Sequence, residues 1–555
     1  MPVRFSARLG LRIFIRPLGS KFIMIPRSWQ GALRSAVGLA AAWHATALAA
    51  PVPVASDVWS EDVEKFAGWL RSPVPERQAA GVQGLSHLKH WPAEEEIIRL
   101  LDHPAPVVRR EALQALGRLG TARAVPALIE QLSNRAWDMR QEAWLSLGRM
   151  TAQNFPADQP GAWKNWWAGK TPAQHRSNLW AALGTSATPR ADLLRALRHL
   201  AEADDEDAVR QWLSVPQKPP IAARERELLC EALERIGTAR SVPVLARLPI
   251  EEAAWALGRI GGAEAEAALW KFPLTLPVLL NLDRLRSTNA APRLGHLVNS
   301  MGLVTYRSQP DDLFMDDPQP IQRVCANLIL RAGEGPRLVE LVLRELEETM
   351  LPPLAKGPKP EPPPPLAPLL AEMRKELKPG FVREDGRTVS QPLTAMYFVA
   401  RDPALAPRLV PLLRHPAFVP RIYVAMTLGR LQARETAPAI LTLLREPYPF
   451  SDATALASGK HFDQSQTVRW KGFLCLALGR MGGEEARLAL EKIAADASAT
   501  RDLRYGAVVG LGFIGSPQSL PVLRRVAAED LIWMVRDTAR QAVENIELAR
   551  KERGT

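Results

Sequence analysis

The chain has 555 residues, too many for one ordinary hydrophobic core, so we expect several compact domains or one extended repeat array. Hydrophobic residues make up 47% and charged residues 23%, which excludes an intrinsically disordered chain, and three cysteines exclude a disulfide framework. The formal net charge of +12 suggests a nucleic-acid-binding protein, so the position of that charge along the chain matters.

The first fifty residues carry seven basic side chains and no acid, since the first carboxylate is Asp57. An apolar run with small residues at its end, SAVGLAAAWHATALAA, follows the basic part. This is the pattern of a secretory signal peptide. We therefore predict a signal peptide over 1–49, cleaved between Ala49 and Ala50, and a periplasmic or secreted mature chain. An uncleaved membrane anchor and a true start at Met24 remain as alternatives.

Removal of this segment changes the charge of the chain. The 71 basic residues less these seven leave 64, against 59 acidic residues, so the net charge falls to +5. A charge this weak argues against nucleic acid as the partner. After removal of the signal peptide we expect no membrane span.

The remaining sequence repeats itself. LLDHPAPVVRREALQALGRL (100–119) and LLRHPAFVPRIYVAMTLGRL (412–431) are identical at eleven of twenty positions. With Gly117 as the reference, equivalent positions recur along the chain, and the undisturbed spacings of 33, 31, 33 and 32 residues are typical of stacked helical repeats. Spacings of 36 and 50 residues imply insertions, and those of 72 and 99 residues imply degenerate repeats as well. The equivalent positions are Gly84, Gly117, Gly148, Gly184, Glu234, Gly258, Leu330, Gly429, Gly479, Gly512 and Glu544.

Each feature around the reference position has a helical explanation. A small residue inside a helix predicts a place where a neighbouring helix approaches closely. Glycine recurs three residues later, where we expect a left-handed helix stop, at Gly120, Gly237, Gly261, Gly482 and Gly515. Proline recurs nine residues after the reference, in the first turn of the next helix, at Pro126, Pro243, Pro438 and Pro521. We predict an all-α fold, a right-handed α-solenoid of stacked helix pairs with loop insertions.

The segment ALQALGRLGTARAVPALIEQL, with Arg109 upstream, resembles the HEAT-like repeat of the phycobilisome-lyase type, as found in exported bacterial proteins of no assigned activity. The resemblance covers most of 74–270 and 401–550, and 320–350 more faintly. It implies the solenoid and says little about activity. Phycobilisome lyases attach bilins to partner proteins, but no motif here carries that chemistry over.

A basic residue stands eight positions before the reference in seven copies, and stacking would align these residues in a ladder. In HEAT proteins such arginines commonly pair with acids of adjacent repeats, and Asp138 and Asp502 are the candidates here. The alternative is a stripe that tracks phosphates of a nucleic acid. The ladder consists of Arg109, Arg140, Arg226, Arg421, Lys471, Arg504 and Arg536.

Interruptions of the repeat define the expected organisation. The segments are a signal peptide (1–49), N-terminal repeats (57–150), a Trp-rich insertion (151–172), partly degenerate helical repeats (173–350), a Pro-rich linker or loop (351–368), a connecting helical segment (369–400) and C-terminal repeats (401–550) with a loop insertion (447–467). In the Trp-rich insertion, Trp163, Trp166 and Trp167 are spaced to share one helix face. We favour a plug against the solenoid edge over an aromatic recognition patch.

Signals of catalysis or metal binding are weak. Four aspartates at 311–317 do not have the spacing of a Ca²⁺ loop, and His461 and Asp463 form only an isolated H-x-D. Each cysteine stands alone in an apolar helical run, so we expect all three to be buried hydrophobic residues. We predict no catalytic residue, no cofactor and no metal site.

The sequence therefore predicts a non-enzymatic scaffold that binds another protein or a peptide on its solenoid surface, with the concave helix face as the binding surface. Two alternatives stay open. The first is a cytoplasmic solenoid that binds nucleic acid, and the second is an enzyme whose site is built from the loop 447–467.

Overall fold

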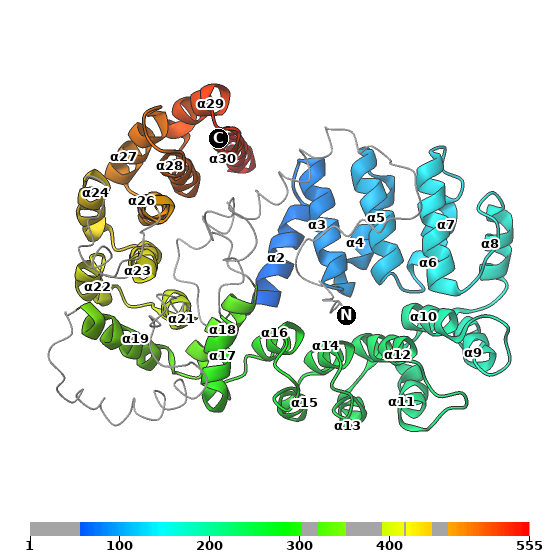
Figure 1. The fold of residues 1–555 in the computed structure, drawn as a ribbon. Helices are drawn as coiled ribbons and strands as arrows, with labels where there is room; N and C mark the ends of the chain where they lie inside the picture. Colours follow the sequence, from blue (N-terminus) through cyan, green and yellow to red (C-terminus); the bar gives the residue numbers. More distant parts are fainter. Residues whose placement is uncertain (1–55, 302–319, 351–390, 416–417, 447–463, 554–555) are drawn as a thin grey trace. The chain divides into compact units, whose positions relative to one another are not determined.

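The computed structural model describes residues 56–301, 320–350, 391–415, 418–446 and 464–553, and every regular element in these ranges is a helix (Figure 1). The predicted all-α solenoid is confirmed. The described residues fall into two compact units, 56–287 and 288–553. The signal peptide, the Pro-rich segment and most of the loop insertion 447–467 lie outside the described residues.

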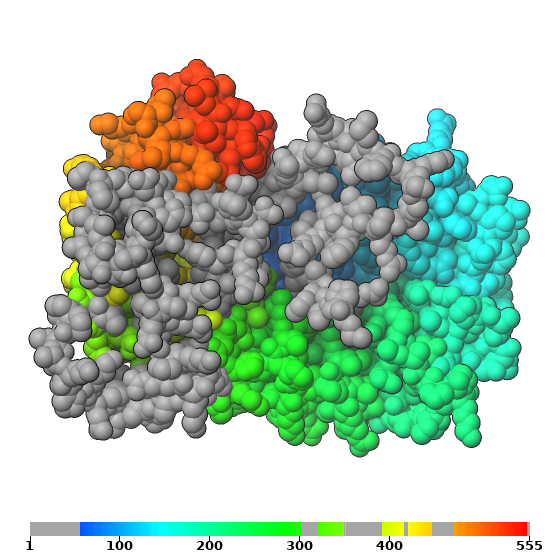
Figure 2. Space-filling model, in the orientation of Figure 1, coloured from blue at the N-terminus to red at the C-terminus, as the bar shows by residue number. Residues whose placement is uncertain are grey.

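In unit 1, eight helices pack side by side in chain order, and a second set of helices lies outside this row (Figure 1). The eight are α2 (Val58–Leu70), α3 (Pro75–His87), α5 (Pro106–Leu119), α7 (Trp137–Thr151), α10 (Arg190–Leu200), α12 (Ala223–Ile236), α14 (Glu251–Ile260) and α16 (Leu276–Arg284). The second set consists of α4 (Glu94–Arg99), α6 (Ala124–Gln131), α8 (Pro160–Ala168), α9 (Pro172–Ala182), α11 (Glu206–Ser214), α13 (Val242–Leu245) and α15 (Ala263–Leu269). Side chains fill the gaps between the helix ribbons, so the segment from α9 to α15 forms one continuous surface in Figure 2.

The row of eight helices in unit 1 closes on itself, because α16 packs against α2. The first backbone N–H of α2, at Val58, donates to Asp283 Oδ2 of α16 at 2.8 Å. The rings of Trp59 and Trp255 are 5.2 Å apart and join α2 to α14. Unit 1 is therefore a closed ring of helices rather than an open arc.

Unit 2 has an inner arc of helices covered by an outer arc (Figure 1). The inner helices are α21 (Gln391–Val399), α23 (Phe418–Arg430), α26 (Gln464–Met481), α28 (Arg501–Ile514) and α30 (Trp533–Arg553). The outer helices are α19 (Gly335–Met350), α22 (Ala406–Leu412), α24 (Ala437–Arg445), α27 (Glu484–Ala495) and α29 (Leu520–Glu529), while α17 (Leu294–Ser300) and α18 (Pro320–Arg331) begin the unit.

The small residue at the reference position marks close helix contacts in unit 2. A Cβ on Gly429 of α23 would lie 2.9 Å from Ala477 Cα of α26. A Cβ on Gly479 of α26 would meet the backbone of Gly510 in α28. The prediction of close approach is confirmed at these positions. It is wrong at Gly184, which follows the end of α9 and has no heavy atom within 4 Å of the site of a Cβ.

The glycine stops divide into two kinds. Gly261, Gly482 and Gly515 have positive φ angles of 74°, 68° and 63°, as predicted. The prediction of a left-handed stop is wrong at Gly120 and Gly237, where φ is −57° and −69°. Glycine is favoured there for a different reason, because a Cβ on Gly120 would lie 2.5 Å from the carbonyl oxygen of Leu116.

The recurring prolines lie in first turns of helices, as predicted. Pro243, Pro438 and Pro521 are the second residues of α13, α24 and α29, and Pro126 is the third residue of α6. Proline is tolerated there because the first backbone N–H groups of a helix have no partner inside the helix.

Substitution of Gly479 by alanine should destabilise unit 2 by about 1–3 kcal/mol, because the new methyl group would push α26 away from α28. The matched control is Gly512→Ala in α28, where the Cβ would lie at an ordinary 3.6 Å from Ala542 and should leave stability equal or slightly higher. Urea unfolding followed by circular dichroism, with hydrogen exchange to locate the change, measures the difference. Equal stability of the two variants would contradict the close contact.

Candidate functional site

The Trp-rich insertion forms helix α8, whose tryptophans pack among themselves and neighbouring aromatic rings. Trp163 is fully buried, and its ring lies 5.3 Å from Phe155 and 6.3 Å from Trp166. Trp167 stacks on His175 of α9, with the ring centroids 4.6 Å apart and the planes at 7°. The three tryptophans therefore form the centre of an aromatic cluster that joins α8 to α9, and Trp163 presents no surface to a partner, which disfavours the alternative of a recognition patch at this residue.

Five of the ladder residues bind the loop that precedes their own helix. Arg109 Nη1 donates to the carbonyl oxygens of His103 and Pro104 at 2.7 and 2.8 Å. Arg140 Nη1 does the same to Asn134 and Arg135, at 2.8 and 3.0 Å. The same connection is made by Arg421 to His415, by Arg504 to Ala499 and by Arg536 to Asp530. Each of these residues closes an inter-helix loop.

Two ladder residues differ from this pattern. Lys471 Nζ reaches the carbonyl oxygens of Leu444 and Glu446, at the end of the preceding helix α24, at 3.0 and 2.7 Å. Arg226 is half-buried in α12, and Arg190 of α10 donates to the carbonyl oxygens of Pro219 and Pro220 in the loop before it. The basic side chain that holds that loop thus comes from another helix.

The expected acidic partners of the ladder are wrong. Asp138 pairs with Arg110 at 2.5 Å, and Asp502 pairs with its neighbour Arg501 at 2.9 Å. An acid from an adjacent helix does reach Arg504, because Asp530 accepts from its Nε at 2.7 Å and from its Nη2 at 3.1 Å. Since the ladder donors are held by loop carbonyls, their geometry disfavours a stripe that tracks phosphates.

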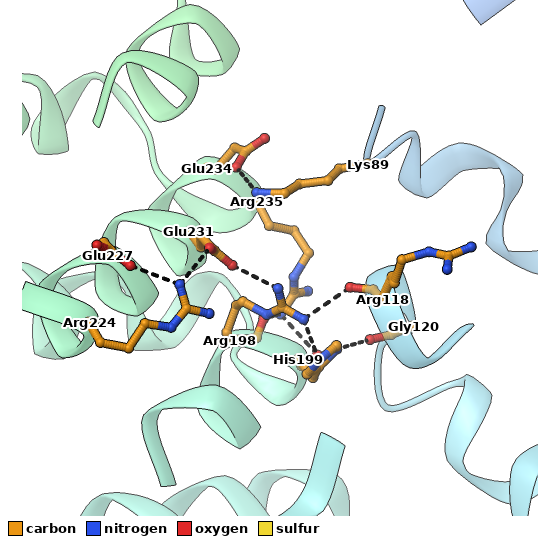
Figure 3. A network of polar contacts seen from close by, with 10 residues as sticks. All are labelled: Lys89, Arg118, Gly120, Arg198, His199, Arg224, Glu227, Glu231, Glu234 and Arg235. Carbon is orange, nitrogen blue, oxygen red and sulfur yellow. Dashed lines mark hydrogen bonds and ion pairs between the residues drawn. The ribbon is translucent and has the colours of Figure 1, made fainter. Parts of the chain in front are cut away.

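A network of buried charges lies where the helix ends of unit 1 converge (Figure 3). Lys89, beyond the end of α3, pairs with Glu234 of α12 at 2.5 Å. Arg198 of α10 pairs with Glu231 of α12 at 2.7 Å and donates to the carbonyl oxygen of Arg118 in α5 at 3.0 Å. Partners separated by 80 to 145 residues thus meet inside the ring.

The ends of the helices in this network supply acceptors as well as charges. Arg235 of α12 donates to the carbonyl oxygens of Arg198, His199 and Ala201 at the end of α10. Backbone carbonyls at a helix C-terminus have no partner within the helix and carry partial negative charge, so a guanidinium group is well placed there.

Arg259 of α14 makes the equivalent contact with the end of α3. Its Nη2 donates to the carbonyl oxygens of Leu88 and Lys89 at 3.0 and 2.7 Å. The guanidinium also lies over the rings of Trp59 and Trp91, 5.4 and 4.7 Å from their centroids. Burial lowers the pKa of Arg259 to about 10, with the nearby Arg284 adding to the effect.

These contacts occupy the interior of the closed ring, so unit 1 has no open concave face of the kind expected from the sequence. The error has a physical origin, because the repeat pattern fixes which helices are neighbours along the solenoid but not whether its two ends meet. The residues responsible, such as Lys89 and Glu234, are far apart in the sequence and carry no local signal. Any partner of unit 1 must bind elsewhere than its inner face.

The sequence analysis missed a pair of exposed aromatic side chains. Trp137 at the start of α7 exposes 69% of its surface, and Trp533 at the start of α30 exposes 61%. They occupy the same register, three residues before the ladder residues Arg140 and Arg536. Beside Trp533, Leu531 exposes 90%. The register was visible in the sequence, but the exposure depends on how each helix start is packed.

The described residues include no group of three or more His, Cys, Asp or Glu side chains that could hold a metal ion. Cys230, Cys325 and Cys475 are buried free thiols, which confirms the predicted burial. No helix in the described ranges is both long and apolar enough to cross a membrane. His461 and Asp463 lie outside the described residues.

A family model for HEAT repeats matches residues 63–150 and 455–544. No curated protein matches the chain. Solved structures with a similar helical fold include a Kap121p mutant (12% identity, TM-score 0.33), a Kap95p chain from a study of its binding to RanGDP (13%, 0.28) and a chain from a study of the interaction between cadherin and beta-catenin (11%, 0.25). Each comparison covers 95% of this chain, and it covers 62%, 78% and 97% of the respective neighbour, so the chain spans less than two thirds of Kap121p.

The buried His199 of α10 should make unit 1 sensitive to acid. Its Nδ1–H donates to the carbonyl oxygen of Gly120 at 2.8 Å, and its Nε2 accepts from Arg198 at 2.5 Å, which fixes the neutral form. Burial, then the charge of Arg198, lowers its pKa well below 6.5, and Arg235 adds to this while Glu231 opposes it. As the pH falls, the unfolded chain binds a proton at His199 before the folded chain does. The contribution of His199 to the free energy of unfolding should therefore be fully present above pH 6.5 and decrease below it, by at most about 1.4 kcal/mol per pH unit.

His199→Gln keeps one donor and one acceptor but does not titrate, so its stability should fall less between pH 7 and pH 5 than that of the unsubstituted protein. The difference isolates His199, because other histidines with a lowered pKa are present in both proteins. Urea unfolding followed by tryptophan fluorescence is a suitable measure, since 12 of the 16 tryptophans lie in unit 1. Parallel pH profiles would show that His199 does not contribute.

Proposed function

We propose that this HEAT-repeat solenoid is a non-enzymatic scaffold that binds another protein, and that it works outside the cytoplasm. The observation that carries the proposal is the pair of exposed tryptophans, Trp137 in unit 1 and Trp533 in unit 2. Tryptophan is the residue type most enriched among the side chains that dominate protein–protein binding energy. An exposed tryptophan costs solubility, so two in the same repeat register support a recognition role over chance.

The position of these side chains also supports protein binding. Trp137 is the first residue of α7, in the row of eight helices of unit 1, and Trp533 is the first residue of α30, in the inner arc of unit 2. Both rings are largely exposed to solvent and not packed in the interior. In unit 1 the inner face is occupied by the unit's own charges, so a partner must bind an outer surface, and the helix starts belong to that surface.

The proposed compartment rests on the sequence of residues 1–49, with their basic start, apolar run and small residues before Ala50. The three cysteines are compatible with an exported chain, because all are buried as free thiols and so are shielded from oxidation outside the cytoplasm.

Trp137→Ala and Trp533→Ala should each weaken capture of the native partner by about tenfold or more, because loss of a central aromatic anchor costs about 2 kcal/mol or more. Affinity purification of the tagged full chain from the exporting cell, followed by titration with the recovered partner, measures this. The control is Leu488→Ala, which removes an apolar side chain of 51% exposure from the outer helix α27 and should bind normally. If both tryptophan variants bind as tightly as the control, the proposed surface is wrong.

The mature chain should begin at Ala50 and be found outside the cytoplasm. Cell fractionation followed by N-terminal sequencing tests both statements at once. A chain that starts at Met1 or Met24 in the cytoplasmic fraction would refute the proposed compartment, while the same start in the membrane fraction would indicate an uncleaved anchor.

A further inference from the structure

Unit 2 gathers arginines at one end of its inner helices. Arg401 follows α21, Arg430 is the last residue of α23, and Arg480 is the penultimate residue of α26. The Arg430 guanidinium lies 5.3 Å from the ring centroids of both Tyr397 and Phe398. Arg480 lies 6.0 Å from the same Tyr397 ring, so successive repeats bring their guanidinium groups to one place.

Two members of this arginine cluster lack a carboxylate among the residues that the structure describes. Arg401 donates from Nη1 to the carbonyl oxygens of Phe398 and Ala400, and its Nε is buried without a hydrogen-bond partner. Arg430 Nε is likewise buried without a partner. Burial lowers the pKa of both residues, that of Arg401 to about 10. The charge of Arg430 adds to the effect on Arg401, and the charges of Arg480 and Arg323 add to it on Arg430, while Tyr397 opposes it there. Buried donors without acceptors and neighbouring like charges are both unfavourable, and a bound anion would relieve both. This pattern is expected of an anion-binding site.

Unit 1 shows what satisfies arginines at the equivalent place. Arg118, which follows the reference position of α5, pairs with Glu111 at 2.6 Å. Arg259, at the same place in α14, has Glu234 4.0 Å from its Nε, although this Nε also has no hydrogen-bond partner. In both cases a glutamate of the same unit supplies the negative charge. The corresponding arginines of unit 2 have the same chemistry but, for Arg401 and Arg430, no such glutamate in the described ranges.

The surroundings favour a carboxylate over a nucleic acid. Single-stranded nucleic acids bind proteins through bases stacked on open aromatic faces. Tyr397 and Phe398 expose only 8% and 4% of their surface, so neither ring is open to a base. The arginines themselves are half-buried, which suits a side-chain carboxylate that inserts between them better than a phosphate backbone that passes above.

We propose that Arg401, Arg430 and Arg480 form a binding site for the carboxylates of an acidic segment in a protein partner. This inference rests on the proposed scaffold function and adds the chemistry of the partner to it. Guanidinium groups bind carboxylates through paired hydrogen bonds, and an inserted carboxylate would give the buried Nε groups of Arg401 and Arg430 an acceptor.

The test uses the purified full chain and a fluorescein-labelled peptide of about ten glutamates at about 0.05 M salt, where screening of charges is weak. Fluorescence anisotropy should give a Kd about tenfold or more below that of a glutamine peptide of equal length. Arg430→Gln should weaken binding of the glutamate peptide by about tenfold or more. The matched control is Arg445→Gln, which removes an exposed arginine at the end of the outer helix α24 and should change the Kd by less than about twofold.

Equal losses in the two variants would indicate diffuse attraction by positive charge and overturn the site, as would the absence of binding or tighter binding of a single-stranded oligonucleotide. Should Arg430→Gln fail to fold, hydrogen exchange on the unsubstituted chain decides. The glutamate peptide should then slow exchange at the C-terminal ends of α23 and α26, and slowing elsewhere only would overturn the proposal.

Because the peptide assay needs no native partner, it is separate from the test of the scaffold function. The two proposals can therefore fail separately. If the glutamate peptide binds but the tryptophan variants still capture the partner normally, the arginine site is supported and the tryptophan surface is refuted.

Discussion

The convergence of helix C-termini is the constraint on which this structure depends. A solenoid of short helices brings the last carbonyl groups of several helices close together, and each such end carries partial negative charge without partners in its own helix. Arginines at the same position of several repeats donate hydrogen bonds to these carbonyl groups. Arg259 holds the end of α3, and Arg235 holds the end of α10, in each case through the carbonyl oxygens of another helix.

The two units use this arrangement differently. In unit 1 the glutamates of α12, Glu231 and Glu234, bring negative charge to the same place, so the arginines and Lys89 become bridges between distant helices and the ring is filled. In unit 2 aromatic rings take the place of glutamates beside Arg430. An aromatic face attracts a guanidinium without neutralising it, so the positive charge remains available to a ligand.

The sequence predicted the parts of the fold that repeat locally and could not predict those that depend on closure. Helix, turn and proline positions follow from spacing, and the close contact at Gly429 follows from a small residue in a helix interior. The predicted register is wrong around α10, where Arg198 and His199 stand at the positions that glycine and arginine occupy in other repeats, and Gly184 lies outside any helix. The bond of Val58 to Asp283 spans 225 residues, and no periodic pattern encodes a contact of that separation.

Repetition also explains why sequence reasoning singled out other side chains than Trp533 and Arg430. The ladder residues and the three tryptophans of α8 are conspicuous because they repeat or cluster, and repetition is the signature of packing as much as of binding. Trp163 and Arg504 are accordingly committed to neighbours inside their own unit. Recognition is better sought where the repeat places a side chain and then fails to satisfy it. Trp533, which the packing leaves exposed, and Arg430, which has aromatic rings beside it where Arg118 and Arg259 have a glutamate, meet that condition.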